Sequence, residues 1–180
     1  MKYIDSIKLN NKVFKTYKIN KQEIHIFKKL HLKILEDTPK EFDYPYNYNK
    51  LKKDFDFKSA IFLTYYKNKP IAYSFVYCFK EENKFKNIFK KYCKISKKDM
   101  NLTAEFAGAG VLKSLRGNLL QDYLINLREK YLKSINYKYS VISAHPDNIY
   151  SKKNILKNNY KLVSIGKKDE NIRLYFKKQI

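Results

Sequence analysis

The chain has 180 residues, 44% of them hydrophobic and 16% aromatic, which is enough for the core of one domain. No run of 18 apolar residues occurs and residues 1–12 are too charged for a signal peptide, so we expect a soluble, cytoplasmic protein with no membrane segment. Cys78 and Cys93 lack a C-x-x-C spacing and neighbouring histidines, which indicates reduced thiols and no metal site.

The net charge of +22 is typical either of a nucleic-acid-binding protein or of a protein that captures a smaller anion. The lysines are spread along the whole chain among many Asn, Ile and Tyr residues, as a compositional bias would produce. Nucleic-acid binding is therefore the less favoured interpretation, and an anionic small ligand is favoured.

Hydrophobic periodicity predicts alternating strands and helices in the first half of the chain. Residues 12–20 alternate like a strand, and 21–37 place Ile24, Phe27, His31, Ile34 and Leu35 on one helical stripe. Residues 41–49 are typical of a loop, 51–55 of a short helix, and 59–80 of a hairpin turning at "KNKP". The next segment, about 81–100, is a polar insertion with a helix around 85–92.

The second half has the order strand (101–113), helix (117–133), strand (137–144), helix (147–158) and two strands (160–166 and 171–177). A β-α-β-α-β-β order requires one parallel strand pair within a mixed sheet.

Small residues interrupt the strand at 101–113. Ala107–Gly110 reads "AGAG", which indicates a bulge or a place where a ligand approaches the backbone. The helix that follows begins near Gly117, and its first N–H groups, together with the helix dipole, favour a phosphate. An ordinary turn containing a glycine explains the same residues.

At this point the sequence resembles the GNAT superfamily of N-acetyltransferases. Residues 111–121, "VLKSLRGNLLQ", are similar to the family pattern V-x-P-x-x-R-G-x-G-L-x, with Arg116, Gly117 and Leu120 matching. Leu119 stands in place of the first signature glycine and Gln121 in place of the second small residue. The resemblance implies that acetyl-coenzyme A is held by Val111, Leu112, Arg116, Gly117, Asn118, Leu119, Leu120 and Gln121.

A second motif follows in the family's order. "SAHPDNIYSKKNILKNNYKLV" (143–163) resembles the strand end and helix that carry h-P-x-N-x-x-[AS], with His145, Pro146, Asn148, Ser151 and Tyr160 matching. The resemblance adds Asn148 and Ser151 to the cofactor-binding residues. Taken alone, "HPDN" is equally typical of a plain helix start.

The chemistry requires a base, because an alkyl ammonium must lose a proton before it attacks a thioester. Glu105 lies eleven residues before Arg116, a spacing that resembles the histone-acetyltransferase branch, and the strand pattern places it beside the small residues. A carboxylate at the exposed end of a strand is the structural alternative. The family's usual tyrosine acid is replaced by Ile155, so Tyr150 or water is left as the proton donor.

The sequence therefore predicts one GNAT-like domain over residues 1–180: an α/β (α+β) fold with a mixed, mostly antiparallel sheet, a central splayed parallel pair, and helices on both faces. The expected activity is acetyl transfer from acetyl-CoA to a primary amine, with Tyr44, Tyr46 and Tyr48 as acceptor contacts or, equally, as core-packing residues. The alternatives are a CoA-binding regulatory module without catalysis and a basic nucleic-acid binder. A homodimer is left open.

Overall fold

The computed structural model describes residues 1–42, 46–54, 58–79, 84–168 and 171–180. The chain divides into two compact units, each described by itself. The first unit is Met1–Val76 with Gly108–Leu127, and the second unit is Tyr77–Ala107 with Arg128–Ile180. None of the described helices is long and apolar enough to cross a membrane.

The strands form a sheet in the order β1-β2-β3-β4-β5-β6-β8-β7. Their bounds are β1 Lys2–Leu9, β2 Lys12–Lys18, β3 Ala60–Tyr66, β4 Lys69–Cys78, β5 Thr103–Val111, β6 Tyr139–Ala144, β7 Lys161–Lys168 and β8 Asn171–Gln179. The pairs β1–β2, β2–β3, β3–β4, β6–β8 and β7–β8 are antiparallel. Strands β5 and β6 are parallel, with Thr103–Glu105 beside Tyr139–Val141.

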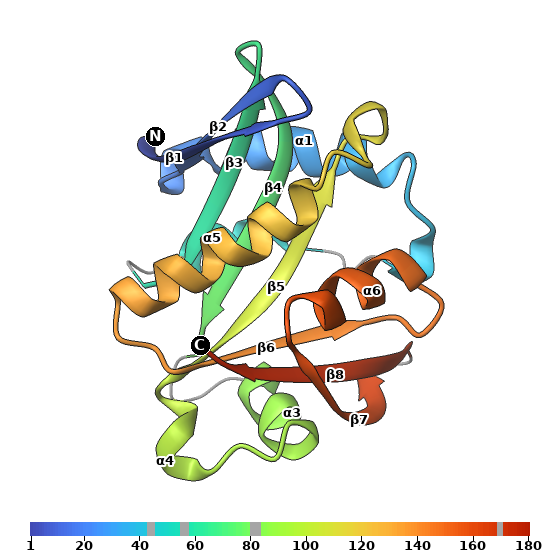
Figure 1. Ribbon diagram of the computed structural model, residues 1–180. Coiled ribbons are helices and arrows are strands. Elements are labelled where there is room, and N and C mark those ends of the chain that lie inside the picture. Colours follow the sequence, from blue (N-terminus) through green and yellow to red (C-terminus); the bar gives the residue numbers. More distant parts are fainter. Residues whose placement is uncertain (43–45, 55–57, 80–83, 169–170) are drawn as a thin grey trace. The chain divides into compact units, whose positions relative to one another are not determined.

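The α-helices are α1 Ile24–Leu35, α2 Tyr48–Asp54, α3 Lys84–Tyr92, α4 Lys97–Met100, α5 Leu120–Ser134 and α6 Ile149–Lys157 (Figure 1). Short 3₁₀ turns occur at Lys21–Glu23, Lys40–Phe42 and Lys113–Leu115. The predicted mixed α+β fold with a mostly antiparallel sheet and one parallel pair is confirmed. Strand β1 was not predicted, and none of its residues is fully buried.

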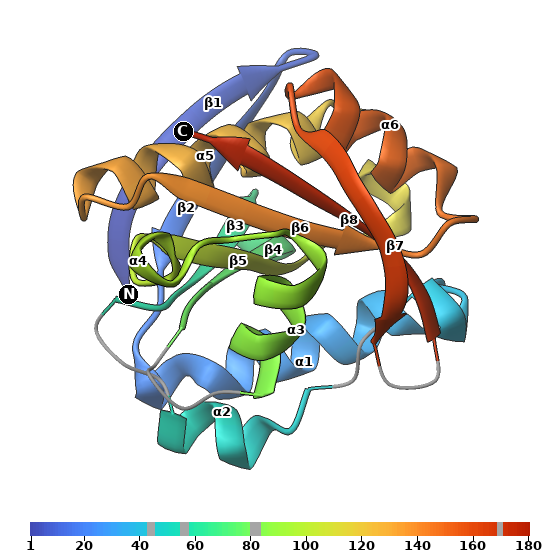
Figure 2. The ribbon, with the colours of Figure 1, turned by 90° about the horizontal axis from the view of Figure 1, so that it is seen from below.

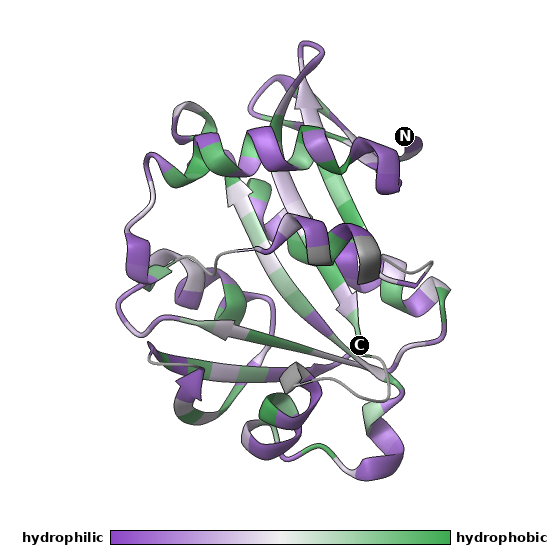
Figure 3. Ribbon diagram, turned by 180° about the vertical axis from the view of Figure 1, so that it is seen from behind, coloured by the Kyte–Doolittle hydropathy of each residue, from purple (hydrophilic) through white to green (hydrophobic). Residues whose placement is uncertain are grey.

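In the first unit, α1 and the start of α5 cover opposite faces of the strands. Thr16 of β2 bonds to Thr64 of β3 at 2.9 Å, and the Tyr123 hydroxyl of α5 donates to Thr16 at 2.9 Å on the same face. On the other face, the ring of Tyr73 in β4 lies 5.1 Å from the ring of Phe27 in α1. In Figure 3, hydrophilic and hydrophobic residues alternate along α1, as expected of a helix with one buried side.

Both hairpins of the first unit turn through two residues with positive φ. Asn10 and Asn11 join β1 to β2 with φ of 46° and 59°, and Lys67 and Asn68 join β3 to β4 with φ of 48° and 61°. Two-residue turns of this kind match the twist of the strands they join, and asparagine tolerates the left-handed region.

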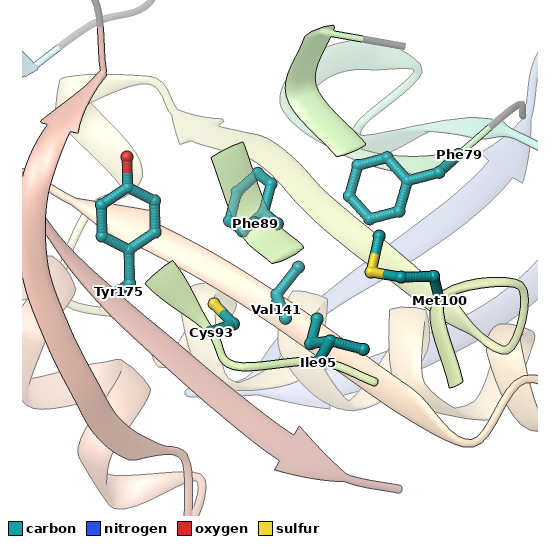
Figure 4. Close-up of a cluster of buried hydrophobic side chains, with 7 residues drawn as sticks. All are labelled: Phe79, Phe89, Cys93, Ile95, Met100, Val141 and Tyr175. Atoms are coloured by element: carbon teal, nitrogen blue, oxygen red, sulfur yellow. The ribbon is translucent and has the colours of Figure 1, made fainter. Parts of the chain in front are cut away.

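In the second unit, α3 and α6 lie on opposite sides of β6 and β8 (Figure 2). On the α6 side, Tyr160 and Ser140 share a hydrogen bond of 2.6 Å. On the α3 side lies a hydrophobic cluster made of Phe79, Phe89, Cys93, Ile95, Met100, Val141 and Tyr175 (Figure 4). Much of this cluster comes from the segment expected to be a polar insertion. From residue 86 on, this segment exposes lysines on its outer side and contributes Phe89, Cys93, Ile95 and Met100 to the core.

Candidate functional site

The turn before α5 holds two residues in the left-handed region of backbone space. Gly117 has φ of 83° and Leu119 has φ of 57°. A Cβ added at Gly117 would meet no atom within 4 Å, and the Leu119 side chain is 57% exposed. The backbone of this turn is therefore open. Leu119 adopts the conformation that favours the glycine of the family pattern, and its side chain does not cover the turn.

The N-terminus of α5 is not capped by the side chain that precedes it. The Tyr123 N–H bonds to the Leu119 carbonyl at 3.2 Å, which leaves the earlier N–H groups of the helix without an acceptor inside it. The Asn118 amide nitrogen donates to the Leu115 carbonyl at 3.0 Å, and its oxygen accepts from Asn10 at 3.2 Å. Backbone N–H groups at a helix N-terminus, reinforced by the helix dipole, favour an anion. The Leu120 side chain is buried and that of Gln121 is half-buried.

Arg116 fixes the turn to the rest of the first unit. Its Nε donates to the Val111 carbonyl at 3.1 Å. Its Nη1 donates at 3.3 Å to the carbonyl of Asp37, which follows the end of α1. The Leu112 N–H bonds to the Ile71 carbonyl of β4 at 2.9 Å. Arg116 and Leu112 thus hold the turn in place.

The glycines of "AGAG" make room for aromatic side chains, which corrects the expectation of space for a ligand. A Cβ at Gly108 would collide with the Tyr46 hydroxyl. A Cβ at Gly110 would lie 2.6 Å from the Tyr73 ring and 3.0 Å from Ile34. Bare backbone is needed here because the rings of the same unit pack directly against β5.

Two of the three predicted acceptor tyrosines pack around a buried histidine. The Tyr48 hydroxyl lies 2.5 Å from Nδ1 of His31, which is fully buried in α1. The Tyr46 ring lies 5.0 Å from the His31 ring and 5.5 Å from the Phe27 ring. Both tyrosines are half-buried, and Tyr44 lies outside the described residues. Core packing, the alternative left open by the sequence, accounts for these contacts.

Glu105 lies in the second unit, in the part of β5 that pairs with β6, and is 4% exposed. Its Oε1 accepts a hydrogen bond from Nζ of Lys168 at 3.1 Å, and both side chains are buried. The exposed strand end, which the sequence left open as an alternative for Glu105, is therefore not its environment. Sequence reasoning did not single out Lys168, which lies 63 residues away in a lysine-rich stretch without a distinguishing pattern.

The start of α6 carries the remaining predicted residues. Asn148 is the N-cap, and its Oδ1 accepts from the Ser151 N–H at 3.0 Å. Tyr150 is 84% exposed, whereas Ile155, at the position of the family's tyrosine, is buried. The HPDN segment thus forms the helix start expected of its residue types, and Tyr150 is accessible to solvent.

The described cysteines and carboxylates offer no metal site. Cys78 and Cys93 are buried and unlinked, and no group of three His, Cys, Asp or Glu side chains is placed to hold a metal within the described ranges. Burial, opposed by the charge of Lys177 and reinforced by that of Glu105, raises the pKa of the Cys93 thiol to about 12.

No protein-family model and no curated protein matches the chain. Solved structures do match. The GNAT domain of PAT from S. lividans aligns with a TM-score of 0.70 at 13% identity, covering 97% of this chain and 96% of that one. An N-acetyltransferase from Staphylococcus aureus Mu50 aligns with a TM-score of 0.65 at 14% identity, covering 92% and 98%. The chain has the GNAT acetyltransferase fold.

A third GNAT-fold match has a ligand in its own structure. yncA from Salmonella typhimurium, solved with acetyl-CoA, aligns with a TM-score of 0.65 at 10% identity, covering 92% of this chain and 93% of that one. Over nearly the full length of both chains, the strand and helix order is therefore that of the GNAT fold.

Proposed function

We propose that the chain is an acetyl-CoA-dependent N-acetyltransferase that acts on a primary amine by direct attack. The observation that carries the proposal is the open turn before α5, where Gly117 and Leu119 adopt left-handed conformations and the first N–H groups of the helix have no acceptor inside it. Such a turn suits a pyrophosphate. The GNAT fold supplies the wider context, and yncA is a protein of this fold solved with acetyl-CoA.

The residues present fit the proposed cofactor. Backbone N–H groups from Gly117 to Gln121 would hold its phosphates, with Arg116 keeping the turn in shape through Val111 and Asp37. Asn148 and Ser151 begin α6, and we assign them to the pantetheine arm of the cofactor through the resemblance of their motif. Acetyl-CoA supplies an acetyl thioester, and the backbone around Val111 is the proposed partner of its carbonyl oxygen.

Glu105 is the proposed base. It takes a proton from the acceptor's ammonium, directly or through a water, and leaves the neutral amine that attacks. Tyr150, exposed on the first turn of α6, is the proposed proton donor to the leaving thiolate. We propose that the acceptor is a small molecule or peptide and that Tyr44, Tyr46 and Tyr48 contact it. Tyr46 and Tyr48 would do so through the part of each side chain that packing around His31 leaves exposed.

Activity is tested by release of free thiol from acetyl-CoA against a panel of primary amines. For an active amine, Glu105→Gln should lower kcat by about ten- to a thousandfold, the usual range for a general base, while calorimetry shows unchanged cofactor affinity. Tyr139→Phe, on the neighbouring strand β6, is a control that should keep full turnover. Unchanged turnover in Glu105→Gln would rule this residue out as the base.

A CoA-binding module without catalysis is the second candidate, favoured by Ile155. The tyrosine that serves as acid in the family is here a buried isoleucine. Cofactor binding in calorimetry, together with no thiol release for any amine in the panel, would favour this second function.

A further inference from the structure

A buried ion pair joins β5 to β7 within the second unit. Nζ of Lys168 lies 3.1 Å from Oε1 of Glu105, and the two side chains are 6% and 5% exposed. Lys168 is the last residue of β7 and faces Asn171 of β8 in the register. The carboxylate that the proposed function uses as a base is therefore held by a lysine from a distant strand.

The pair lies against the hydrophobic cluster of Figure 4. Nζ of Lys168 is 5.5 Å from the centre of the Phe89 ring, and Val141 of β6 is the register partner of Glu105. Phe89 and Val141 are fully buried. In such surroundings a carboxylate without a partner is costly, and it avoids that cost by binding a proton.

The other titratable groups near the pair do not replace Lys168. Tyr92 at the end of α3 and Cys93 just after it lie on one side, and β8 contributes Tyr175, Arg173 and Lys177. Each of these groups is coupled electrostatically to Glu105 or to a neighbour of it. Burial raises the pKa of Cys93 to about 12 and, together with the charges of nearby groups, also raises the pKa of Tyr175. Both side chains are therefore neutral near pH 7. Among the described residues, Lys168 is the cation that hydrogen-bonds to the carboxylate.

We propose that Lys168 is a positioning residue for Glu105, keeping its carboxylate ionised and its Oε1 fixed so that Oε2 accepts the proton of the acceptor's ammonium. This role rests on the proposed function, in which Glu105 is the base. An opposite charge at hydrogen-bond distance favours the ionised form of a carboxylate, and removing one partner of a buried pair leaves the other uncompensated.

The test reads the charge state of Glu105 in the protein without ligand. The protein is labelled with ¹³C at glutamate carboxyls, the Glu105 signal is assigned with Glu105→Gln, and the signal is followed by NMR from pH 4 to 9. In Lys168→Met the Glu105 signal should titrate at least about one pH unit higher than in the parent, a tenfold change in proton affinity. Lys168→Arg, which keeps the positive charge, should remain close to the parent.

The matched control is Lys178→Met. Lys178 forms another semi-buried pair in the second unit, with Nζ 2.8 Å from Glu129. This variant should move the Glu129 signal and leave that of Glu105 unchanged. If Lys168→Met fails to fold, Lys168→Gln, which keeps an N–H donor without the charge, takes its place.

Turnover supplies the second readout. With an active amine, the acidic limb of the pH–rate profile of Lys168→Met should move to higher pH by the same interval as the carboxyl titration. If Glu105 titrates at the same pH in the parent and in the neutral Lys168 variant, the inference is overturned, whether or not turnover changes. Absence of thiol release in the parent would instead contradict the proposed function, because the titration requires no substrate.

Discussion

Leu119 occupies a backbone conformation that glycine adopts without steric cost. Its φ of 57° brings Cβ close to the following carbonyl, which costs about 1 kcal/mol for a residue other than glycine. Because the Leu119 side chain is exposed, its burial offsets little of this conformational cost. The strain is therefore localised in the turn whose N–H groups we assign to phosphate binding, where strained residues are often found.

Leu119→Gly should raise the free energy of unfolding by up to about 0.5 kcal/mol, because the relief of strain exceeds the added flexibility of glycine in the unfolded chain. Urea unfolding followed by circular dichroism measures the change. Leu119→Ala, which loses the same exposed side chain but keeps Cβ, is the matched control and should not be stabilised. A Gly variant less stable than the Ala variant would contradict this account.

At the scale of elements, β5 is shaped by the aromatic residues packed on it. Gly110 lies under the Tyr73 ring, and Ile34 of α1 closes the same space. The bare strand lets Tyr73 of β4 and Ile34 of α1 approach the backbone within the first unit. The same logic applies in the second unit, where the Tyr92 ring covers Gly166 of β7.

Gly110→Ala should therefore destabilise the protein by about 1–3 kcal/mol, the usual range for an overpacked core, since its Cβ would lie 2.6 Å from the Tyr73 ring. Chemical denaturation gives the value. In a double-mutant cycle, Tyr73→Leu should offset part of the loss in Gly110→Ala. If the stability losses of the two substitutions simply add, the destabilisation in Gly110→Ala does not come from contact with the Tyr73 ring.

Cys93, which directly follows α3, makes the stability of the protein depend on pH because its thiol is buried. The pKa of this thiol is about 12 in the folded state, chiefly through burial, and about 8.5 in an unfolded chain. The folded state therefore favours the protonated thiol. Its contribution to stability is complete below about pH 8.5 and is lost as the pH rises from there toward 12.

At pH 8.5, a thiol reagent should not modify Cys93 in the native protein and should modify it within seconds in urea. Mass spectrometry of the quenched, digested protein assigns the labelled cysteine. Cys93→Ala should show a smaller loss of stability between pH 8 and 10 than the parent. Rapid native labelling of Cys93 would mean that the cluster around it opens readily.

For the whole molecule, the proposed cofactor should stabilise the fold. A ligand at 100 times its Kd adds about 2.7 kcal/mol, which corresponds to a Tm increase of roughly 5–10 °C for a chain of this length. A thermal melt with and without CoA measures it. Gly117→Val should fold but show a smaller shift, because the side chain would stand in the open space through which the phosphates approach the turn. A folded parent with no shift in millimolar CoA would contradict cofactor binding.

The sequence predicted the elements whose signal is local. Helix α1, the β3–β4 hairpin and the order from β5 to β8 follow from periodicity and turn residues, and the parallel pair follows from that order. Strand β1 was missed because none of its residues is fully buried and charged residues interrupt its pattern. The positive φ of Leu119 runs against the preference of its residue type, so no propensity predicts it.

Only those parts of the candidate site that form within one stretch of sequence could be predicted. The turn at 116–121 and the start of α6 are contiguous in sequence, and each forms within a single stretch of chain. The pair of Glu105 with Lys168 depends on a contact between strands far apart in sequence, and nothing in "GKKDEN" distinguishes the buried lysine from its exposed neighbours.

The segment between β4 and β5 has a consequence for any attempt to shorten the protein. In sequence it has the polar character of a dispensable loop, yet Phe89, Cys93 and Met100 from it are almost completely buried. Excising it would remove the hydrophobic cover from Tyr175 and Val141 and bring water to the Lys168–Glu105 pair. A minimal version of this protein has to keep α3 and α4, since both belong to the hydrophobic cluster and Phe89 of α3 lies against the ion pair.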